Sequence, residues 1–266
     1  MRTGSCEVRH LFGPDGRHAL ETALRRRPLL AFDFDGTLAP IVERPDDARV
    51  AQELAQRMEL LAQRLPVAIV TGRSVADVRG RLGFSPRFVV GNYGAEGPEG
   101  DDGLGLDGSA LDGVRARLAA HAADLRAAGI QVEDKRLSLT LHYRSAPDPG
   151  EAVARIDSLL AQLDSGVRTF GGKCVVNVVL AAAPDKADAM RSLVRRAACS
   201  AAVFVGDDSS DEAVFAHSPA NWLTVRIGLD DPGSRAAFFL SGPHEMRPLL
   251  DAMLSVLNGS AAGPAA

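Results

Sequence analysis

The sequence predicts an α/β protein: a core built on a parallel sheet, interrupted by an inserted α+β cap domain with a four-stranded antiparallel sheet. Apolar runs typical of buried strands alternate with amphipathic helices near both ends of the chain, which is the pattern of a parallel sheet covered on both faces. In the middle of the chain, a helix followed by two strands occurs twice. We therefore expect core segments at 1–96 and 183–266, a cap at 97–182 and a flexible tail from about residue 258.

The first core segment contains three short apolar runs that indicate buried strands. They lie at residues 28–34, 66–70 and 88–90, and each is bounded by charged residues, glycine or proline. Between the first two runs, residues 50–64 carry leucine and methionine at spacings of three and four, which indicates an amphipathic helix. A strand–helix–strand order of this kind predicts parallel strands.

The middle of the chain has a different pattern. Residues 97–108 are rich in glycine and acidic residues, which is typical of a loop or linker. Two helices and four strands are then expected, with the helices on one face of an antiparallel sheet. Their expected ranges are 109–128 and 150–163 for the helices, and 131–134, 137–143, 167–170 and 174–180 for the strands.

The core pattern resumes after residue 183. We expect a helix at 184–198, a strand at 202–205 and a helix after it. Two more strands are expected at 222–227 and 236–240, followed by a last helix at 244–257.

Composition excludes several classes of function. The chain has 266 residues, of which 34 are acidic and 30 basic, for a net charge of −4, so nucleic acid is not an expected partner. No run approaches the 18 apolar residues of a membrane span. The three cysteines, at positions 6, 174 and 199, are an odd number without metal-ligand spacing, which argues against a disulfide framework and against a zinc site. We expect a cytoplasmic monomer that acts on a small molecule.

Polar residues follow the predicted core strands where each strand ends. Ligands of open parallel sheets bind outside these carboxyl ends, so the residues should converge in space. Carboxylates about 4 Å apart repel by roughly 4 kcal/mol at an effective dielectric constant near 20, which calls for a cation, and hard oxygen ligands suit Mg²⁺. The residues are Asp33, Asp35, Thr71, Gly72, Arg73, Lys186 and Asp207.

This set suggests phosphoryl transfer. Asp33 could attack phosphorus, and Asp35, two residues on, could protonate the leaving oxygen and later deprotonate water. Thr71 and Lys186 would hold the phosphate. The alternative is that aspartates at strand ends only form turns or cap helices. Four such motifs occur in order along the chain, each at the end of a predicted strand or at the start of a predicted helix. This recurrence favours a catalytic role.

The motifs DFDGT, TGR, a helix-start lysine and GDDSSDE resemble the haloacid dehalogenase-like superfamily. Together with GNYGAE, VEDKRLSLTLHYR and GGK, they resemble the trehalose-6-phosphate phosphatase family in particular. The resemblance implies a Rossmann-like haloacid dehalogenase core, a Mg²⁺ cofactor and a phosphorylated sugar as substrate. It implies that Asp33 is the nucleophile and Asp35 the acid/base. The implied metal residues are Asp33, Asp35, Asp207, Asp208 and Asp211.

The predicted cap strand at 137–143 alternates apolar and polar residues, so one of its faces presents Ser138, Thr140 and His142, with Arg144 just beyond. This polar face could form a roof of hydrogen-bond donors over the phosphate site, or it could simply face water. As candidates for substrate binding we take Gly72, Arg73, Glu133, Lys135, His142, Arg144, Lys173 and Asn177.

The sequence departs from the family pattern at several positions. Tyr93 stands where histidine is usual, Asn177 where glutamate is usual, and Ala187 where glycine is usual; Val179 and Leu180 replace an arginine and a proline. These changes leave the catalytic carboxylates intact but bear on the substrate, since a site built for hydrogen bonds discriminates strongly. Trehalose 6-phosphate is the first expectation. A related sugar or pseudo-disaccharide phosphate, such as an aminocyclitol analogue, and a non-catalytic sugar-phosphate sensor are the alternatives.

Overall fold

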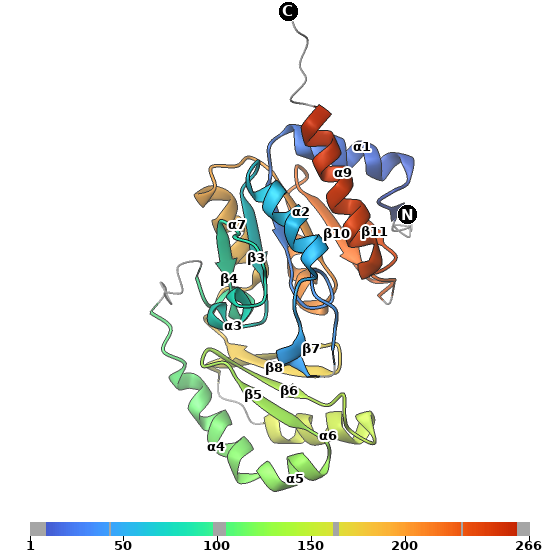
Figure 1. Ribbon diagram of the computed structural model, residues 1–266. Helices are drawn as coiled ribbons and strands as arrows, with labels where there is room; N and C mark the ends of the chain where they lie inside the picture. Colours follow the sequence, from blue (N-terminus) through green and yellow to red (C-terminus); the bar gives the residue numbers. More distant parts are fainter. Residues whose placement is uncertain (1–8, 43, 98–104, 162–164, 230, 260–266) are drawn as a thin grey trace, which may run out of the picture.

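The computed structural model describes residues 9–42, 44–97, 105–161, 165–229 and 231–259. It contains a seven-stranded parallel sheet and a separate four-stranded antiparallel sheet, which confirms the predicted fold class (Figure 1). All four antiparallel strands come from the stretch between the fourth parallel strand and helix α7. We call the unit around the seven-stranded sheet the core and the unit around the four-stranded sheet the cap.

The core sheet has the strand order β1-β11-β10-β9-β2-β3-β4, and every neighbouring pair is parallel. Strand β2 lies between β3 and β9, so the carboxyl ends of these three strands are adjacent. The strands are β1 (Arg9–His10), β2 (Leu29–Phe32), β3 (Val67–Val70), β4 (Phe88–Val90), β9 (Ala202–Gly206), β10 (Leu223–Ile227) and β11 (Phe238–Leu240).

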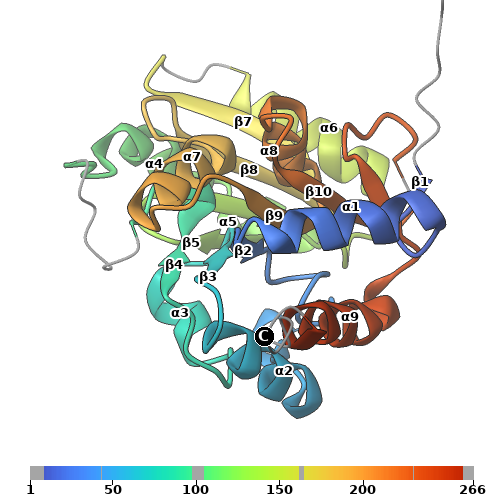
Figure 2. The ribbon, with the colours of Figure 1, turned by 90° about the horizontal axis from the view of Figure 1, so that it is seen from above.

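Helices cover both faces of the core sheet because its strands are apolar on both sides. On one face, α1 (Pro14–Arg25), α2 (Gln52–Ala62) and α9 (Met246–Gly259) pack with the side chains of Leu30 and Phe32. On the other face, α7 (Lys186–Arg196) and α8 (Glu212–His217) pack with Leu29 and Ala31. Figure 2 shows α2 and α9 on the opposite side of the sheet from α7 and α8. The short α3 (Val75–Arg79) follows β3.

The cap sheet has the order β5-β6-β8-β7 and lies between the cap helices and the core (Figure 1). One face packs on the helices through a buried cluster that includes Leu118, Leu139, Ile156 and Val178. The other face therefore points at the carboxyl ends of the core strands. The cap elements are α4 (Asp112–Ala120), α5 (Ala122–Ala127), β5 (Gln131–Asp134), β6 (Ser138–His142), α6 (Pro149–Leu160), β7 (Val167–Gly172) and β8 (Val175–Leu180).

Some elements differ from the sequence prediction. No helix is predicted before residue 28, yet α1 forms there, with a proline at its N-terminal turn and buried residues Leu20, Ala23 and Leu24. The helix expected at 109–128 is a 3₁₀ turn followed by two helices that break at His121. Helix α9 continues to Gly259, past the expected start of the tail, and residues 260–266 lie outside the described residues. Most of the expected linker, 98–104, and the end of the helix expected to reach 163 also lie outside them.

Candidate active site

The predicted polar residues lie at the ends of three adjacent strands. Asp33 follows β2, Thr71 follows β3, and Asp207 follows β9. The amide of Asp33 donates to the carbonyl of Val205 at 2.9 Å, which continues the sheet one residue beyond the strand. Parallel pairing thus brings together Asp33 and Asp207, which lie 174 positions apart in the sequence.

Three carboxylates form a buried cluster at this edge. Oxygens of Asp33, Asp207 and Asp211 all lie within 4.8 Å of one another. The Lys186 ammonium donates to Asp33 at 2.9 Å and to Asp211 at 2.7 Å. Asp211 also accepts the backbone amides of Asp207 and Asp208, each at 3.0 Å, so it orders the loop after β9.

Glycine is required beside this cluster. Gly36 has a φ of +77°, a left-handed conformation that glycine adopts without strain. A Cβ atom at Gly36 would lie 2.1 Å from Oδ2 of Asp207, so a side chain there would displace that carboxylate. The glycine of the DFDGT motif therefore makes room for the acidic residue that follows β9.

The three carboxylates of the cluster hold more negative charge than the two lysines that contact them, Lys186 and Lys173, can balance. Burial raises the pKa of Asp33 well above its usual value, against the opposing effect of Lys186, and Asp211 and Asp207 raise it further. Burial likewise raises the pKa of Asp207 to about 6, although Lys173 opposes this. Burial disfavours the charge of Lys186, but Asp211 and Asp33 outweigh it and raise the pKa of the ammonium.

A divalent cation fits this donor set. Three carboxylates with oxygens in mutual reach, of which two have raised pKa values, present hard oxygen ligands whose repulsion a cation would relieve. The residues that could hold it are Asp33, Asp207 and Asp211. The carboxylates of Asp35 and Asp208, which the sequence analysis included among the metal residues, lie outside this cluster.

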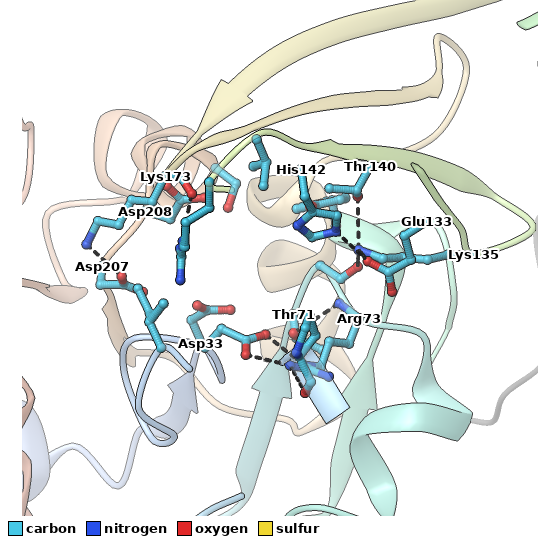
Figure 3. A pocket seen from close by; sticks show the side chains of 18 of the residues that line it. Asp33, Thr71, Arg73, Glu133, Lys135, Thr140, His142, Lys173, Asp207 and Asp208 are labelled. Atoms are coloured by element: carbon cyan, nitrogen blue, oxygen red, sulfur yellow. Dashed lines mark hydrogen bonds and ion pairs between the residues drawn. The ribbon is translucent and has the colours of Figure 1, made fainter. Parts of the chain in front are cut away.

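Asp35 points toward an arginine instead. The Arg73 guanidinium donates to Asp35 through Nε at 2.7 Å and Nη2 at 2.8 Å, and to Asp77 through Nη1 at 2.8 Å. Arg73 is 9% exposed, and its Nη2 also donates to the carbonyl of Pro45. Figure 3 shows Arg73 beside Thr71 at the floor of the pocket. Arg73 thus contacts the predicted acid/base residue, and its donors are already engaged there.

The cap supplies the opposite wall of the pocket. Glu133 on β5 lies 2.9 Å from Nε2 of His142 and 3.4 Å from the Lys135 ammonium. The Lys135 ammonium also donates to the carbonyl of Gly72 at 3.2 Å, which joins cap to core. These side chains face Asp33 and Thr71 across the pocket (Figure 3), so the predicted polar roof faces the core.

A second contact joins cap and core at the hairpin between β7 and β8. Lys173 donates to Oδ2 of Asp207 at 2.8 Å, and Ser209 donates its hydroxyl to the carbonyl of Gly171. A Cβ atom at Gly172 would lie 2.9 Å from Oδ2 of Asp208. The hairpin tip therefore lies directly on the loop that follows β9.

One pocket between core and cap collects nearly all the predicted residues. Two predicted cap residues lie outside it. Asn177 is fully buried behind Tyr93 and Thr140, which do line the pocket, and Ser138 is fully buried and donates to Oδ1 of Asn92. Asp211 lies behind Lys186 and the loop after β9. The predicted residues that line the pocket are Asp33, Asp35, Thr71, Gly72, Arg73, Glu133, Lys135, His142, Arg144, Lys173, Lys186, Asp207 and Asp208.

Sequence reasoning missed an apolar part of the same pocket. Ile41, Val42 and Pro45, from the loop after β2, contribute to its lining, and Ile41 is 43% exposed. An Ile-Val pair between Pro40 and Pro45, outside the predicted strand and helix, was the available signal. Thr37, in the DFDGT motif, donates to Oδ1 of Asp207 at 3.3 Å and was not assigned a role.

The trehalose-phosphatase family model matches residues 31–222, which are about 72% of the 266 residues. The matched part includes Asp33, Lys186 and Asp207. The chain belongs to the trehalose-phosphatase family.

Known relatives agree with this membership. The chain is 32% identical over 264 residues to a trehalose-phosphate phosphatase of Mycolicibacterium paratuberculosis, covering 91% of this chain and 66% of that protein. It is 32% identical over 239 residues to an uncharacterized glycosyl hydrolase of Mycobacterium tuberculosis, covering 82% of this chain but 18% of that protein. This chain therefore spans less than two thirds of either relative.

A solved structure shows the same fold. The C-terminal domain of trehalose-6-phosphate phosphatase from C. albicans superposes with a TM-score of 0.77 at 21% identity, covering 94% of this chain and 98% of that one. In the part of the chain that the structure describes, no helix is both long enough and apolar enough to cross a membrane.

The positions at which this chain departs from its family pattern lie in different surroundings. Val179 and Leu180 are buried in the cap, and Ala187 is buried against the core sheet. None of the three lines the pocket, whereas Tyr93 does. Tyr93 is thus the departure that touches the space where a substrate would bind.

Proposed function

We propose that this protein is a phosphatase that hydrolyses trehalose 6-phosphate to trehalose and phosphate. The observation that carries the proposal is the placement of Asp33 and Lys186 in one pocket with Glu133 and His142. The first pair suits a phosphoryl group, and the second pair suits sugar hydroxyls. Family membership supports the same activity.

In the first step, an oxygen of Asp33 attacks phosphorus and the bond from phosphorus to the sugar oxygen breaks. The sugar oxygen takes a proton from Asp35, and an aspartyl-phosphate forms on Asp33. Lys186, 2.9 Å from Asp33, holds the nucleophile and offers positive charge to the phosphoryl oxygens. Asp33, Asp207 and Asp211 would hold a Mg²⁺ ion, which would supply positive charge to the transferring phosphoryl group.

In the second step, Asp35 takes a proton from water, and the water oxygen attacks phosphorus. The bond from phosphorus to Asp33 breaks, which restores the carboxylate and releases phosphate. Asp35 must leave Arg73 to reach the leaving oxygen. Arg73 keeps Asp77 and the carbonyl of Pro45 as partners, so its charge stays compensated while Asp35 turns.

One observation keeps a second substrate under consideration. Asn177 lies behind the pocket wall, so Glu133 is the carboxylate that the described cap residues present to a substrate. A pseudo-disaccharide phosphate with fewer hydroxyls to bind would need fewer acceptors. The sensor alternative has no such support, because the acidic cluster and its lysine are complete.

The test is phosphate release from a panel: trehalose 6-phosphate, glucose 6-phosphate, an aminocyclitol pseudo-disaccharide phosphate and p-nitrophenyl phosphate. We expect kcat/KM for trehalose 6-phosphate to exceed that for the other esters by about 100-fold or more. EDTA should abolish turnover, and Mg²⁺ should restore it. Equal rates on all esters would overturn the substrate, and tight sugar-phosphate binding without any turnover would overturn the enzyme. Gel filtration would test the expectation of a monomer.

A further inference from the structure

Tyr93 lies at the junction of core and cap in a conformation that few residues adopt. Its φ is +61°, which costs a non-glycine residue about 1 kcal/mol and persists only where the surroundings hold it. Its ring lies over Gly72, where an added Cβ atom would come within 2.4 Å of Cε1. The ring also meets Phe170 of β7 edge to face, with 5.0 Å between centroids. Tyr93 thus fills the space between the phosphate-side turn of the core and the cap sheet.

The Tyr93 hydroxyl determines how a buried amide is turned. It donates to Oδ1 of Asn177 at 2.8 Å, and the same oxygen accepts the hydroxyl of Thr140 at 3.0 Å. Nδ2 of Asn177 is buried without a hydrogen-bond partner among the residues that the structure describes. The amide therefore keeps its oxygen toward two hydroxyls even though its nitrogen stays unbonded.

This orientation fixes the direction of the next hydrogen bond. Thr140 has one hydroxyl proton, and that proton is donated to Asn177, so Thr140 can only accept from another donor. The donor is the ammonium of Lys135, at 3.0 Å. Lys135 also contacts Gly72 and Glu133 (Figure 3). A continuous chain of hydrogen bonds therefore runs from the core tyrosine to the sugar-facing wall of the cap.

We propose that Tyr93 is a positioning residue for recognition of the sugar. By holding the Asn177 amide, it keeps Thr140 as an acceptor for Lys135 and so holds Glu133 at the pocket wall. Without the hydroxyl, Asn177 can turn its NH₂ toward Thr140. The Thr140 proton would then lose Oδ1 as its acceptor, so the hydroxyl could rotate and would no longer hold the Lys135 ammonium in one place. Asp33 and Lys186 take no part in this chain. The inference rests on the proposed function, in that a sugar phosphate is the substrate.

The test is Tyr93→Phe, which keeps the ring and removes the hydroxyl. We expect KM for trehalose 6-phosphate to rise about tenfold, the effect of 1.4 kcal/mol, with kcat within about twofold of wild type. Both constants for p-nitrophenyl phosphate, which carries no sugar, should stay unchanged. Tyr143→Phe is the matched control, because Tyr143 is the other tyrosine of the chain and lies in the cap away from the pocket lining. It should change neither substrate.

A second variant separates orientation from packing. Asn177→Asp keeps the accepting oxygens and removes the NH₂ group, so nothing can turn toward Thr140. In that background, Tyr93→Phe should raise KM for the sugar phosphate less than about threefold. A penalty that stays tenfold, or equal changes for both substrates, would mean that Tyr93 acts through packing and would overturn the inference. If wild type does not prefer the sugar phosphate at all, the proposed function fails instead.

Discussion

The ammonium of Lys173 lies 2.8 Å from Oδ2 of Asp207, across the boundary between cap and core. Asp207 belongs to the buried acidic cluster, so a cap residue contacts a group that could bind a cation. The cap hairpin and a cation therefore share Asp207. This relationship predicts that cap closure and cation binding influence each other.

Lys173→Met should tighten cation binding. A unit charge about 4 Å from the cation opposes binding by on the order of 4 kcal/mol at an effective dielectric constant near 20, before screening. We expect the dissociation constant for Mn²⁺, measured by calorimetry without substrate at pH 8, to fall about tenfold. Arg144→Met is the control, since Arg144 lines the same pocket but donates to the carbonyl of Lys173. An unchanged dissociation constant in Lys173→Met would disprove the coupling.

Glu133→Gln should weaken recognition of the sugar without affecting the reacting group. Burial opposes the charge of Glu133, but hydrogen bonds and attraction from His142 and Lys135 outweigh it and lower the pKa of the carboxyl. We expect kcat/KM for trehalose 6-phosphate to fall about 10- to 100-fold, and that for p-nitrophenyl phosphate to change little. Asp134→Asn is the control, because Asp134 is the next residue on β5 and pairs with Arg115. Equal losses on both esters would remove Glu133 from sugar recognition.

Asp77→Asn should destabilise the fold at neutral pH. Asp77 accepts from Arg73 and Arg81, and although burial opposes its charge, those arginines lower its pKa. The stability that comes from a lowered carboxyl pKa is present above the unfolded-state value and is lost as the pH falls through the folded-state value. We expect the free energy of unfolding to drop by about 1–2 kcal/mol at pH 7 and by less at pH 2.5.

The free energies of unfolding of the wild type and of Asp77→Asn would be measured by urea unfolding at pH 7 and at pH 2.5. Other charged groups near Asp77 are Asp35 and Asp46, which contact the same arginines and remain in the variant. Asp157→Asn, at an exposed position of α6, should change the free energy of unfolding by less than about 0.5 kcal/mol. A loss as large at pH 2.5 as at pH 7 would show that the Asp77 contribution is not electrostatic.

Asp33→Asn should abolish turnover while leaving the protein folded. An amide oxygen is a poor nucleophile, so kcat should fall by at least about a thousandfold. The change also removes one of three mutually repelling buried carboxylates, so the thermal midpoint should not drop by more than a few degrees. Phosphate release and circular dichroism would be measured together. Retained turnover would exclude Asp33 as the nucleophile.

The sequence predicted the site residues at the ends of core strands better than the residues whose position depends on contacts between core and cap. Asp33, Thr71 and Asp207 converge because β2, β3 and β9 are neighbours, and strand order of this kind follows from the βα alternation. Asn177 was expected to bind substrate, but it is buried behind Tyr93. Alternation along a strand predicts on which face of the sheet a residue lies. It does not predict which residues of a second domain cover that face.

The sequence also did not predict the contact between Arg73 and Asp35. Arg73 was assigned to substrate binding because it follows the phosphate-holding Thr71, yet its donors contact Asp35 and Asp77. Asp35 lies 38 positions before Arg73 in the sequence and Asp77 lies 4 positions after it. Only the positions of these carboxylates in space determine that the guanidinium contacts both. Helix α1 was missed for a simpler reason: its apolar stripe is short, although Pro14 marked its start.

The measurement that tests the central claim most directly is borohydride trapping of the enzyme during turnover of trehalose 6-phosphate, followed by peptide mass analysis. Borohydride reduces an acyl phosphate to an alcohol and leaves free carboxylates intact. The account predicts reduction at Asp33 during turnover, and no reduction there when the substrate is left out. Reduction at another carboxylate, or none while phosphate is released, would contradict it.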